Sequence, residues 1–181
     1  MRTENLENYL KSFGRTIVKE AKGVLQSEKG TTALGKSIDF KVTKEPQGYS
    51  VKFYMLDYGT FLDKGVSGNK VKRTFTDYKL KKESSPYSYT TKQPPPDVLS
   101  KWIKKKGIEP KGLGRGRDKN TGQYISNLAF IIGRKIKARG IPSISFFSKP
   151  FGNNYKDLGK NILKEFKIDV TNYITTFTKN K

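Results

Sequence analysis

The spacing of apolar residues predicts an amphipathic helix at the start of the chain, over residues 4–26. From Leu6 onward, apolar residues recur at steps of three and four positions. Thr3 stands where a helix N-cap is expected, and Glu4 and Glu7 place negative charge in the first turn, where the helix dipole favours it. We therefore expect one face of this helix to be buried.

A period of two follows, over residues 37–43 and again over residues 49–57. Between them, 45-EPQG-48 carries proline and glycine placed as in a type II turn. Alternation on both sides of a short turn predicts an antiparallel β-hairpin with one buried face. The hairpin and the helices on either side of it predict an α+β fold, an antiparallel β-sheet packed by N-terminal, middle and C-terminal helices.

Residues 64–94 have no sustained period, and the stretch ends in the proline-rich 84-SSPYSYTTKQPPP-96. A connection of this length is unusual inside a compact domain unless it is functional or is ordered by a partner. We expect a single domain, residues 1–181, with a long projecting arm at about 64–94 that another subunit completes. The aromatic residues that the arm offers to a neighbouring subunit are Phe75, Tyr78, Tyr87 and Tyr89.

Two helices are predicted in the second half of the chain. The first starts at 95-PPD-97 and stops at Gly107, and Trp102 shares its apolar face, which favours a core role over base stacking. The second covers residues 123–139 and ends at Gly140, a natural residue after a helix C-terminus.

The rest of the second half is less regular. Residues 141–151 predict a short strand or an extended crossing, and a last helix is expected from Asn153 or Asn154. The tail 169-DVTNYITTFT-178 is rich in β-branched residues, so the pattern leaves open whether it is helix or strand.

The charge balance changes the functional picture. The chain has 37 lysine and arginine residues against 16 acidic residues, a net charge of +21. Such an excess favours a polyanionic partner, nucleic acid first and an acidic membrane surface second. The N-terminal MRTENLENYL has no apolar core of a secretory signal, and the longest apolar run, 128-LAFII-132, is too short to span a bilayer.

Cysteine and histidine are both absent. Disulfides, thiolate nucleophiles, Cys/His zinc sites and histidine-dependent catalysis are therefore excluded. Asp57 and Asp63 are close in sequence and could bind magnesium or act as acid and base. No third acid lies near them, so a metal-dependent nuclease is a weaker hypothesis than an architectural role. In that role Gly59 and Gly65 let the chain bend or take a positive φ as it leaves the strand.

A basic helix and loop at about 97–122 form the candidate nucleic-acid contact. Lysine and arginine contact phosphates without reading sequence. The loop 112-GLGRG-116 lacks the strand and the GK[ST] ending of a phosphate-binding loop. We expect no cofactor and no metal, and the candidate nucleic-acid-facing residues are Lys104, Lys105, Lys106, Lys111, Arg115, Arg117 and Lys119.

Two segments together resemble a known family. In 58-YGTFLDKGVSG-68, Tyr58, Gly59, Asp63 and Gly65 are similar to the Tyr-(Ala/Gly)-x-x-x-(Glu/Asp)-x-Gly motif of tailed-phage tail-completion or neck proteins, the HK97 gp10-like family. The segment 146-FFSKPF-151 resembles the aromatic segment that precedes the last helix in that family, with Lys149 where arginine is more usual. The order of elements is similar over roughly residues 4–170, although the insertion at 66–122 is longer and more basic than in a minimal member.

The resemblance implies a structural virion protein and no enzyme. Members form a homo-oligomeric ring of the head–tail connector, between the portal or adaptor and the tail, with double-stranded DNA passing through the lumen. It implies assembly in the bacterial host cytoplasm and a final place in the virion neck or tail, with no membrane contact. Tyr58, Gly59, Asp63 and Gly65 would then lie at or near the subunit interface. The alternative is a non-specific nucleic-acid-binding protein that acts as a monomer or dimer.

Overall fold

The computed structural model describes residues 3–108 and 123–179, and these form two compact units. The first unit comprises Met1–Asp63, Thr76–Glu83 and Ile144–Lys181. The second unit comprises Lys64–Phe75 and Ser84–Ser143. The chain passes between the units four times, so the second unit is an insertion in the first. Whether the two behave as the single domain expected from the sequence stays a prediction.

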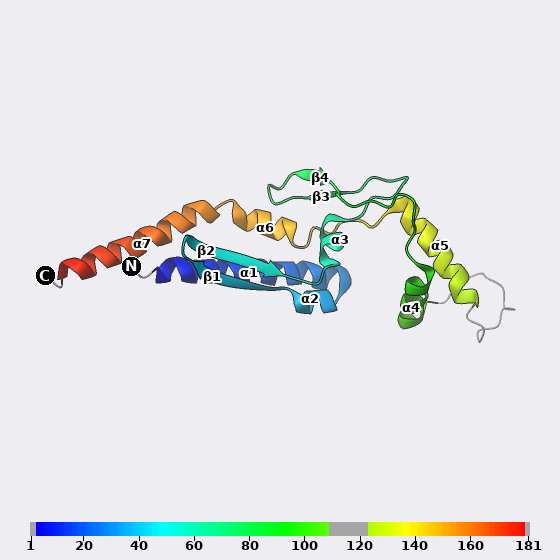
Figure 1. The fold of residues 1–181 in the computed structure, drawn as a ribbon, viewed down its shortest axis with the longest axis horizontal. Coiled ribbons are helices and arrows are strands. Elements are labelled where there is room, and N and C mark those ends of the chain that lie inside the picture. Colours follow the sequence, from blue (N-terminus) through cyan, green and yellow to red (C-terminus); the bar gives the residue numbers. More distant parts are fainter. Residues whose placement is uncertain (1–2, 109–122, 180–181) are drawn as a thin grey trace. The chain divides into compact units, whose positions relative to one another are not determined.

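The first unit is built around one long helix, α1 (Glu4–Lys29). A short helix α2 (Ala33–Ser37) leads into the antiparallel hairpin of β1 (Asp39–Glu45) and β2 (Gly48–Tyr54), which lies alongside α1 (Figure 1). Helices α6 (Ser148–Tyr155) and α7 (Leu158–Lys179) return to α1 from the C-terminal part of the chain. The predicted α+β fold with an antiparallel sheet and flanking helices is confirmed.

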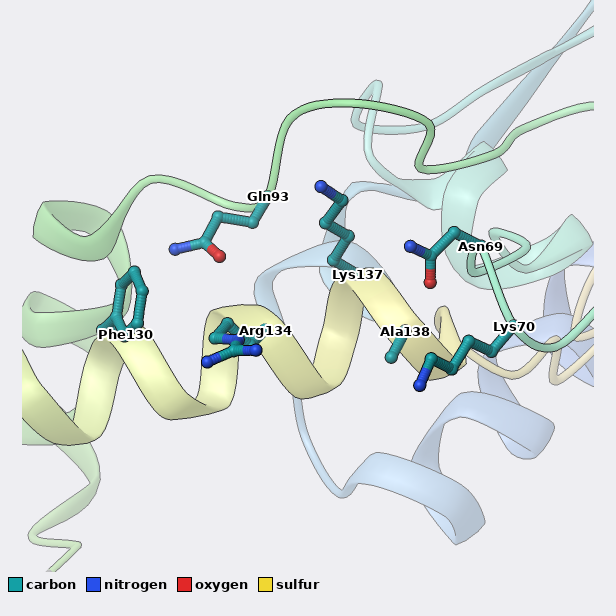
Figure 2. Close-up of a pocket in the computed structure, with 7 residues that line it drawn as sticks. All are labelled: Asn69, Lys70, Gln93, Phe130, Arg134, Lys137 and Ala138. Atoms are coloured by element: carbon teal, nitrogen blue, oxygen red, sulfur yellow. The ribbon is translucent and has the colours of Figure 1, made fainter.

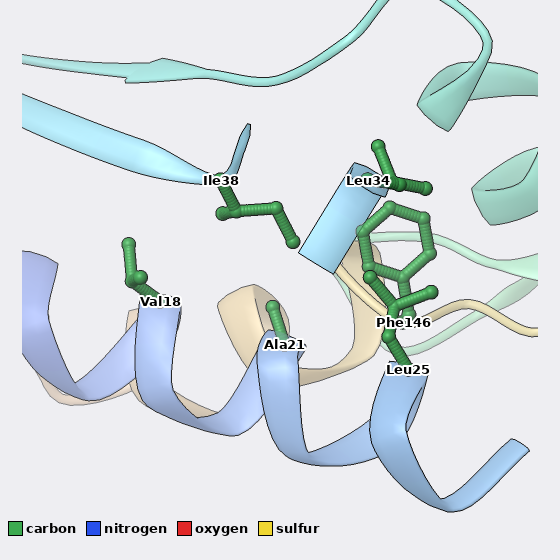
Figure 3. Close-up of a cluster of buried hydrophobic side chains, with 6 residues drawn as sticks. All are labelled: Val18, Ala21, Leu25, Leu34, Ile38 and Phe146. Atoms are coloured by element: carbon green, nitrogen blue, oxygen red, sulfur yellow. The ribbon is translucent and has the colours of Figure 1, made fainter. Parts of the chain in front are cut away.

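The core of this unit joins segments that are far apart in sequence. Three residues of α1 meet one residue each from α2, from the approach to β1 and from the approach to α6 (Figure 3). Burial of these side chains on one face of α1 confirms the amphipathic helix predicted from the spacing. The cluster consists of Val18, Ala21, Leu25, Leu34, Ile38 and Phe146.

A buried aspartate of α7 holds the beginning of α1. The Asp169 side chain is only 3% exposed, and its carboxylate accepts hydrogen bonds from the backbone N–H groups of Asn5 (3.1 Å) and Leu6 (3.0 Å) and from the Asn5 amide (2.9 Å). These N–H groups have no partner within their own helix. Thr3 occupies the N-cap position as predicted, but its side chain makes no capping bond. Asp169 supplies the cap instead.

The second unit contains two helices, α4 (Pro96–Lys106) and α5 (Gln123–Arg139), which pack on each other. Both were predicted, and Gly107 and Gly140 follow them in the left-handed conformation, with φ of 60° and 70°. The boundary with the first unit falls within a small antiparallel pair, β3 (Thr74–Thr76) and β4 (Lys82–Ser84).

Three local predictions need correction. The β1–β2 turn is not type II, because that turn needs a positive φ at its third residue and the positive φ falls instead on Gly48 (144°). The strand predicted over residues 49–57 already ends at Tyr54, and helix α3 (Gly59–Lys64) begins five residues later. Trp102 is 44% exposed, because Ile103 takes the buried position on α4.

The C-terminal part is more helical than its composition suggests. Residues 148–151 begin α6 and do not form a strand or an extended crossing. The open question of the tail is settled as helix, since α7 runs through residues 169–178. Within it, Thr175 and Thr176 donate their hydroxyls to backbone oxygens four residues earlier, the bonding pattern common for threonine inside a helix.

The hydrogen bonds of Asp169 predict how the stability of the fold depends on pH. Burial alone would raise the pKa of Asp169, but the hydrogen bonds from Leu6 and Asn5 outweigh it and hold the pKa below its usual value. A carboxylate with a lowered folded-state pKa contributes stability above its unfolded pKa of about 3.9, and this is lost as pH falls through the folded value.

Replacement Asp169→Ala should therefore lower the free energy of unfolding at neutral pH by about 1–2 kcal/mol, a typical value for a lost helix cap. The difference between variant and parent should shrink at acid pH, where the parent carboxylate is itself protonated. Urea denaturation followed by circular dichroism at neutral and acid pH measures both. A difference that stays constant with pH would contradict a role for the ionised carboxylate.

Candidate assembly surfaces and nucleic-acid interface

The two segments that resemble the phage family touch each other through Asp63. This side chain, at the end of α3, is 4% exposed. Its carboxylate accepts hydrogen bonds from the backbone N–H of Phe147 (2.7 Å) and of Ser148 (3.0 Å), and from the Ser148 hydroxyl. Ser148 is the first residue of α6, whose N-cap residue makes no side-chain cap of its own. Asp63 therefore caps α6 from 84 residues away in sequence.

The backbone strengthens the same junction. The carbonyl oxygens of Leu62 and Asp63 accept hydrogen bonds from the N–H groups of Ile144 (3.0 Å) and Ser145 (3.1 Å). A negative charge at a helix N-terminus is favoured by the helix dipole and by the N–H groups that point at it. Asp63 thus has an architectural role, as the sequence favoured.

The same geometry argues against a metal site at the two aspartates. Asp57 is exposed, whereas Asp63 is buried and occupied by the α6 backbone. Across residues 3–108 and 123–179, no three acidic side chains gather in a way that could hold a metal ion.

Glycine is required at two positions of the first motif for different reasons. Gly65 has a φ of 70°, and a Cβ on it would lie 2.8 Å from the Ser143 nitrogen, so the predicted positive φ is confirmed. Gly59 lies within α3, and a Cβ there would meet Met55 Sδ at 2.7 Å and a Leu34 methyl at 3.0 Å. Gly59 therefore serves close packing and not a bend.

Positive charge is concentrated in the second unit. Its 72 residues carry 17 lysine and arginine residues against three acidic ones, a net +14 of the total +21. The first unit, with 109 residues, carries 20 basic and 13 acidic residues, a net +7. The polyanion preference inferred from composition is thus mainly a property of one unit.

A loop of the second unit closes the C-terminal end of α5 and brings cations to it. The N–H groups of Asn69 and Lys70 donate to the carbonyl oxygens of Lys137 (2.9 Å) and Ala138 (3.0 Å). Arg73 donates its Nε to the next carbonyl, that of Arg139 (2.8 Å). The last carbonyls of a helix have no partner within the helix, so this loop is fixed there by the bonds it supplies.

These contacts form one wall of a pocket with a cavity volume of about 280 Å³ (Figure 2). Three side chains that line it are cations, two are amides, and none is acidic. On α5, Arg134 is four residues after Phe130 and three before Lys137, so the three share a helix face. The lining residues are Asn69, Lys70, Gln93, Phe130, Arg134, Lys137 and Ala138.

The predicted nucleic-acid residues are only partly placed. Lys104, Lys105 and Lys106 are exposed at the end of α4. Lys111, Arg115, Arg117 and Lys119 lie outside the described residues. Lys70 and the cations of α5 were not among the residues chosen from the sequence. The signal that could have found them is the second basic run, 70-KVKR-73, together with 134-RKIKAR-139.

The first unit has an apolar surface of a different kind around α3. Four large side chains, Tyr54, Leu56, Tyr58 and Phe61, are each between 41% and 49% exposed. The chain has no lysine or arginine between Lys52 and Lys64, although 37 of its 181 residues are basic. We call these four residues the α3 surface. Clustered exposed apolar residues mark interaction sites more often than scattered ones do.

A second such surface lies at the end of α7. Residues after Asp169 continue past the beginning of α1, where Tyr173 and Ile174 are 49% and 55% exposed (Figure 1). No lysine or arginine lies between Lys167 and Lys179. We call residues 170–178 the α7 end.

The two surfaces lie toward opposite ends of the first unit. Asp169, just before the α7 end, contacts Leu6 of α1. The α3 surface adjoins Gly59, which packs on Leu34, and Leu34 belongs to the same buried cluster as Leu25 near the other end of α1. The 19 residues from Leu6 to Leu25 span about 30 Å of helix.

The aromatic residues of the predicted arm have partners in their own chain. Tyr78 packs edge-on against Tyr155, with ring centroids 5.7 Å apart. Phe75 lies 5.7 Å below the Lys64 ammonium. The backbone of Tyr87 and Tyr89 pairs with Ser67, and burial raises the pKa of the Tyr89 phenol. Residues 64–94 are therefore part of the two units, and a second subunit contacting them stays a prediction.

The Asp63 junction can be tested by its contribution to stability. Asp63→Ala leaves two buried N–H groups and a hydroxyl without this acceptor, which should lower the free energy of unfolding by about 2–4 kcal/mol. Asp57→Ala is the matched control, and its exposed site should change stability by less than about 0.5 kcal/mol. Urea denaturation of both variants makes the comparison, and equal effects would contradict the proposed cap.

Comparison with family models, with curated proteins and with solved structures found no match for this chain. Among the described helices, none is long and apolar enough to cross a membrane. The structure therefore assigns no family, and its function has to be argued from the surfaces themselves.

Proposed function

We propose that this chain is a structural protein of a tailed-phage head–tail connector, forming a neck or tail-completion ring that links the portal to the tail around the DNA channel. The observation that carries the proposal is the separation of two properties. Exposed apolar side chains from two segments that contain no lysine or arginine lie toward opposite ends of one unit, and most of the positive charge lies in the other unit.

Two different surfaces at opposite ends suit head-to-tail assembly. A heterologous contact joins one patch of a subunit to a different patch of the next, and a ring forms when the rotation closes. Copies that each carry +21 repel one another, so contact is favoured where lysine and arginine are absent. In the first unit these places are the α3 surface and the α7 end.

The contact between the motif segments adds support. The resemblance rests on Asp63 in one segment and on 146-FFSKPF-151 in the other, and Asp63 caps the helix that starts in that second segment. Because the Asp63 carboxylate caps the N-terminus of α6, the two segments depend on each other, which explains why both would occur together in one fold. A strongly basic second unit suits a protein that lines a DNA channel.

Assembly can be tested with paired point substitutions. We expect the parent chain to form a ring without DNA, seen by light scattering and by negative-stain electron microscopy. Tyr58→Lys on the α3 surface and Ile174→Lys at the α7 end should each abolish it, because each places a cation in a contact that excludes charge. Deleting residues 66–94 is a poorer test, since Asn69 and Lys70 cap α5.

Mixing the two variants distinguishes the geometry. In head-to-tail assembly each variant keeps one intact surface, so an equal mixture should form dimers of the two and stop there. Val98→Lys, at an exposed apolar position of the second unit, is the control and should assemble like the parent. A parent chain that is monomeric, or variants that assemble normally, would contradict the ring.

The second candidate function is a non-specific nucleic-acid-binding protein that acts as a monomer or dimer. The basic pocket of the second unit favours it, because that pocket needs no second subunit. A monomeric chain that binds DNA tightly would be the result that selects this alternative.

A further inference from the structure

We propose that the pocket at the C-terminal end of α5 binds the phosphodiester backbone of nucleic acid through Lys70, Arg134 and Lys137. This inference rests on the proposed function, in which DNA passes close to the protein. It adds a specific binding site, on residues that the sequence analysis did not select.

The pocket brings together three side chains of like charge, and no acidic side chain is among its lining residues. Lys70 comes from the loop after α3, and Arg134 and Lys137 come from α5. None of the three makes an ion pair with any residue in the described ranges. Grouping cations in this way costs free energy in the absence of an anion. Residues that are kept despite such a cost in stability are commonly functional.

The helix dipole accounts for only part of the cluster. Cations in the last turn of a helix are stabilised by its partial negative charge, which explains Lys137 and Arg139. Arg134 lies before that turn, and Lys70 is on another segment. Lys137 also donates to the Thr91 carbonyl at 2.6 Å, so its ammonium is held in place at the pocket wall.

The other lining groups fit a phosphate and its sugar. The side-chain amides of Asn69 and Gln93 add neutral hydrogen-bond donors, and an arginine guanidinium can bond a phosphate through two N–H groups. The volume of about 280 Å³ is much larger than the ~30 Å³ that one water molecule occupies in the liquid. It therefore has room for a phosphate with its neighbouring sugar.

Phe130 adds a flat apolar side to the pocket. Its ring is 48% exposed and lies 6.0 Å from the Arg134 guanidinium carbon. An exposed ring beside cations is typical of surfaces that follow a nucleic-acid backbone, where it contacts sugars or bases without reading their sequence. The lining thus predicts binding that is independent of base sequence.

The test measures DNA affinity against salt concentration, by fluorescence anisotropy with a short labelled duplex and a single strand of the same sequence. The variant is Lys70→Gln/Arg134→Gln, because neither side chain donates a hydrogen bond to another residue in the part of the chain that the structure describes. We expect this variant to bind both probes about tenfold more weakly. The slope of log affinity against log salt concentration should also become shallower, by the amount that corresponds to about two lost phosphate contacts.

Two control variants isolate the pocket. Lys19→Gln/Lys41→Gln removes the same charge from exposed positions of the first unit and should change affinity far less. Lys70→Arg/Arg134→Lys keeps both charges and should bind within about threefold of the parent, since phosphate contact is mainly electrostatic. Circular dichroism confirms that each variant is folded.

The outcomes separate this inference from the proposed function. If Lys70→Gln/Arg134→Gln and Lys19→Gln/Lys41→Gln weaken DNA binding equally, affinity follows net charge and the pocket proposal is overturned, while the assembly proposal is unaffected. An unchanged affinity of Lys70→Gln/Arg134→Gln for DNA also overturns the pocket proposal. If the parent chain shows no salt-sensitive DNA binding, both the pocket proposal and the DNA contact of the connector are overturned. If the parent chain forms no ring in light scattering, only the connector proposal is overturned.

Discussion

The first unit depends on two buried carboxylates that cap helices from distant parts of the chain. Asp63 of α3 caps α6, and Asp169 of α7 caps α1. Each bond joins segments that are more than 80 residues apart, so the two caps fix the N-terminal and C-terminal parts of the chain on each other. A two-stranded hairpin cannot do this alone, because isolated hairpins are at best marginally stable in water. Carboxylates that point at helix N-termini therefore hold distant segments together alongside the apolar core.

Positive charge is divided unequally between the units. The second unit holds two thirds of the net charge in 72 of 181 residues, whereas the α3 surface and the α7 end of the first unit come from segments without lysine or arginine. A protein that must meet both its own copies and a polyanion faces opposing requirements, since the charge that attracts DNA repels the next subunit. If the proposed function holds, placing the two tasks on separate surfaces satisfies both requirements.

Periodic patterns in the sequence were enough to predict the long elements. Local spacing of apolar residues predicts the buried face of α1 and the alternation in β1 and β2. Local spacing and glycines such as Gly107 and Gly140 also predict the bounds of α4 and α5. The predictions that were wrong concern features that depend on contacts between residues far apart in the sequence. The helix at Ser148 depends on a carboxylate 85 positions away, and Ile103 rather than Trp102 is buried because of how α4 packs on α5. The basic pocket could not be predicted either, since it forms only when the loop at Asn69 closes the end of α5.

The position of Asp169 also bears on the order of events during synthesis. Helix α1 is synthesised long before its cap, because Asp169 follows Leu6 by 163 residues, and Phe146 of the core also comes much later than α1. The inserted second unit can fold while the first is still incomplete, because domains generally fold as units once their residues have emerged. Residues 170–178 follow the cap directly. If the α7 end is an assembly contact, as proposed above, a nascent chain cannot offer it to a neighbour until the residues that cap α1 have been made.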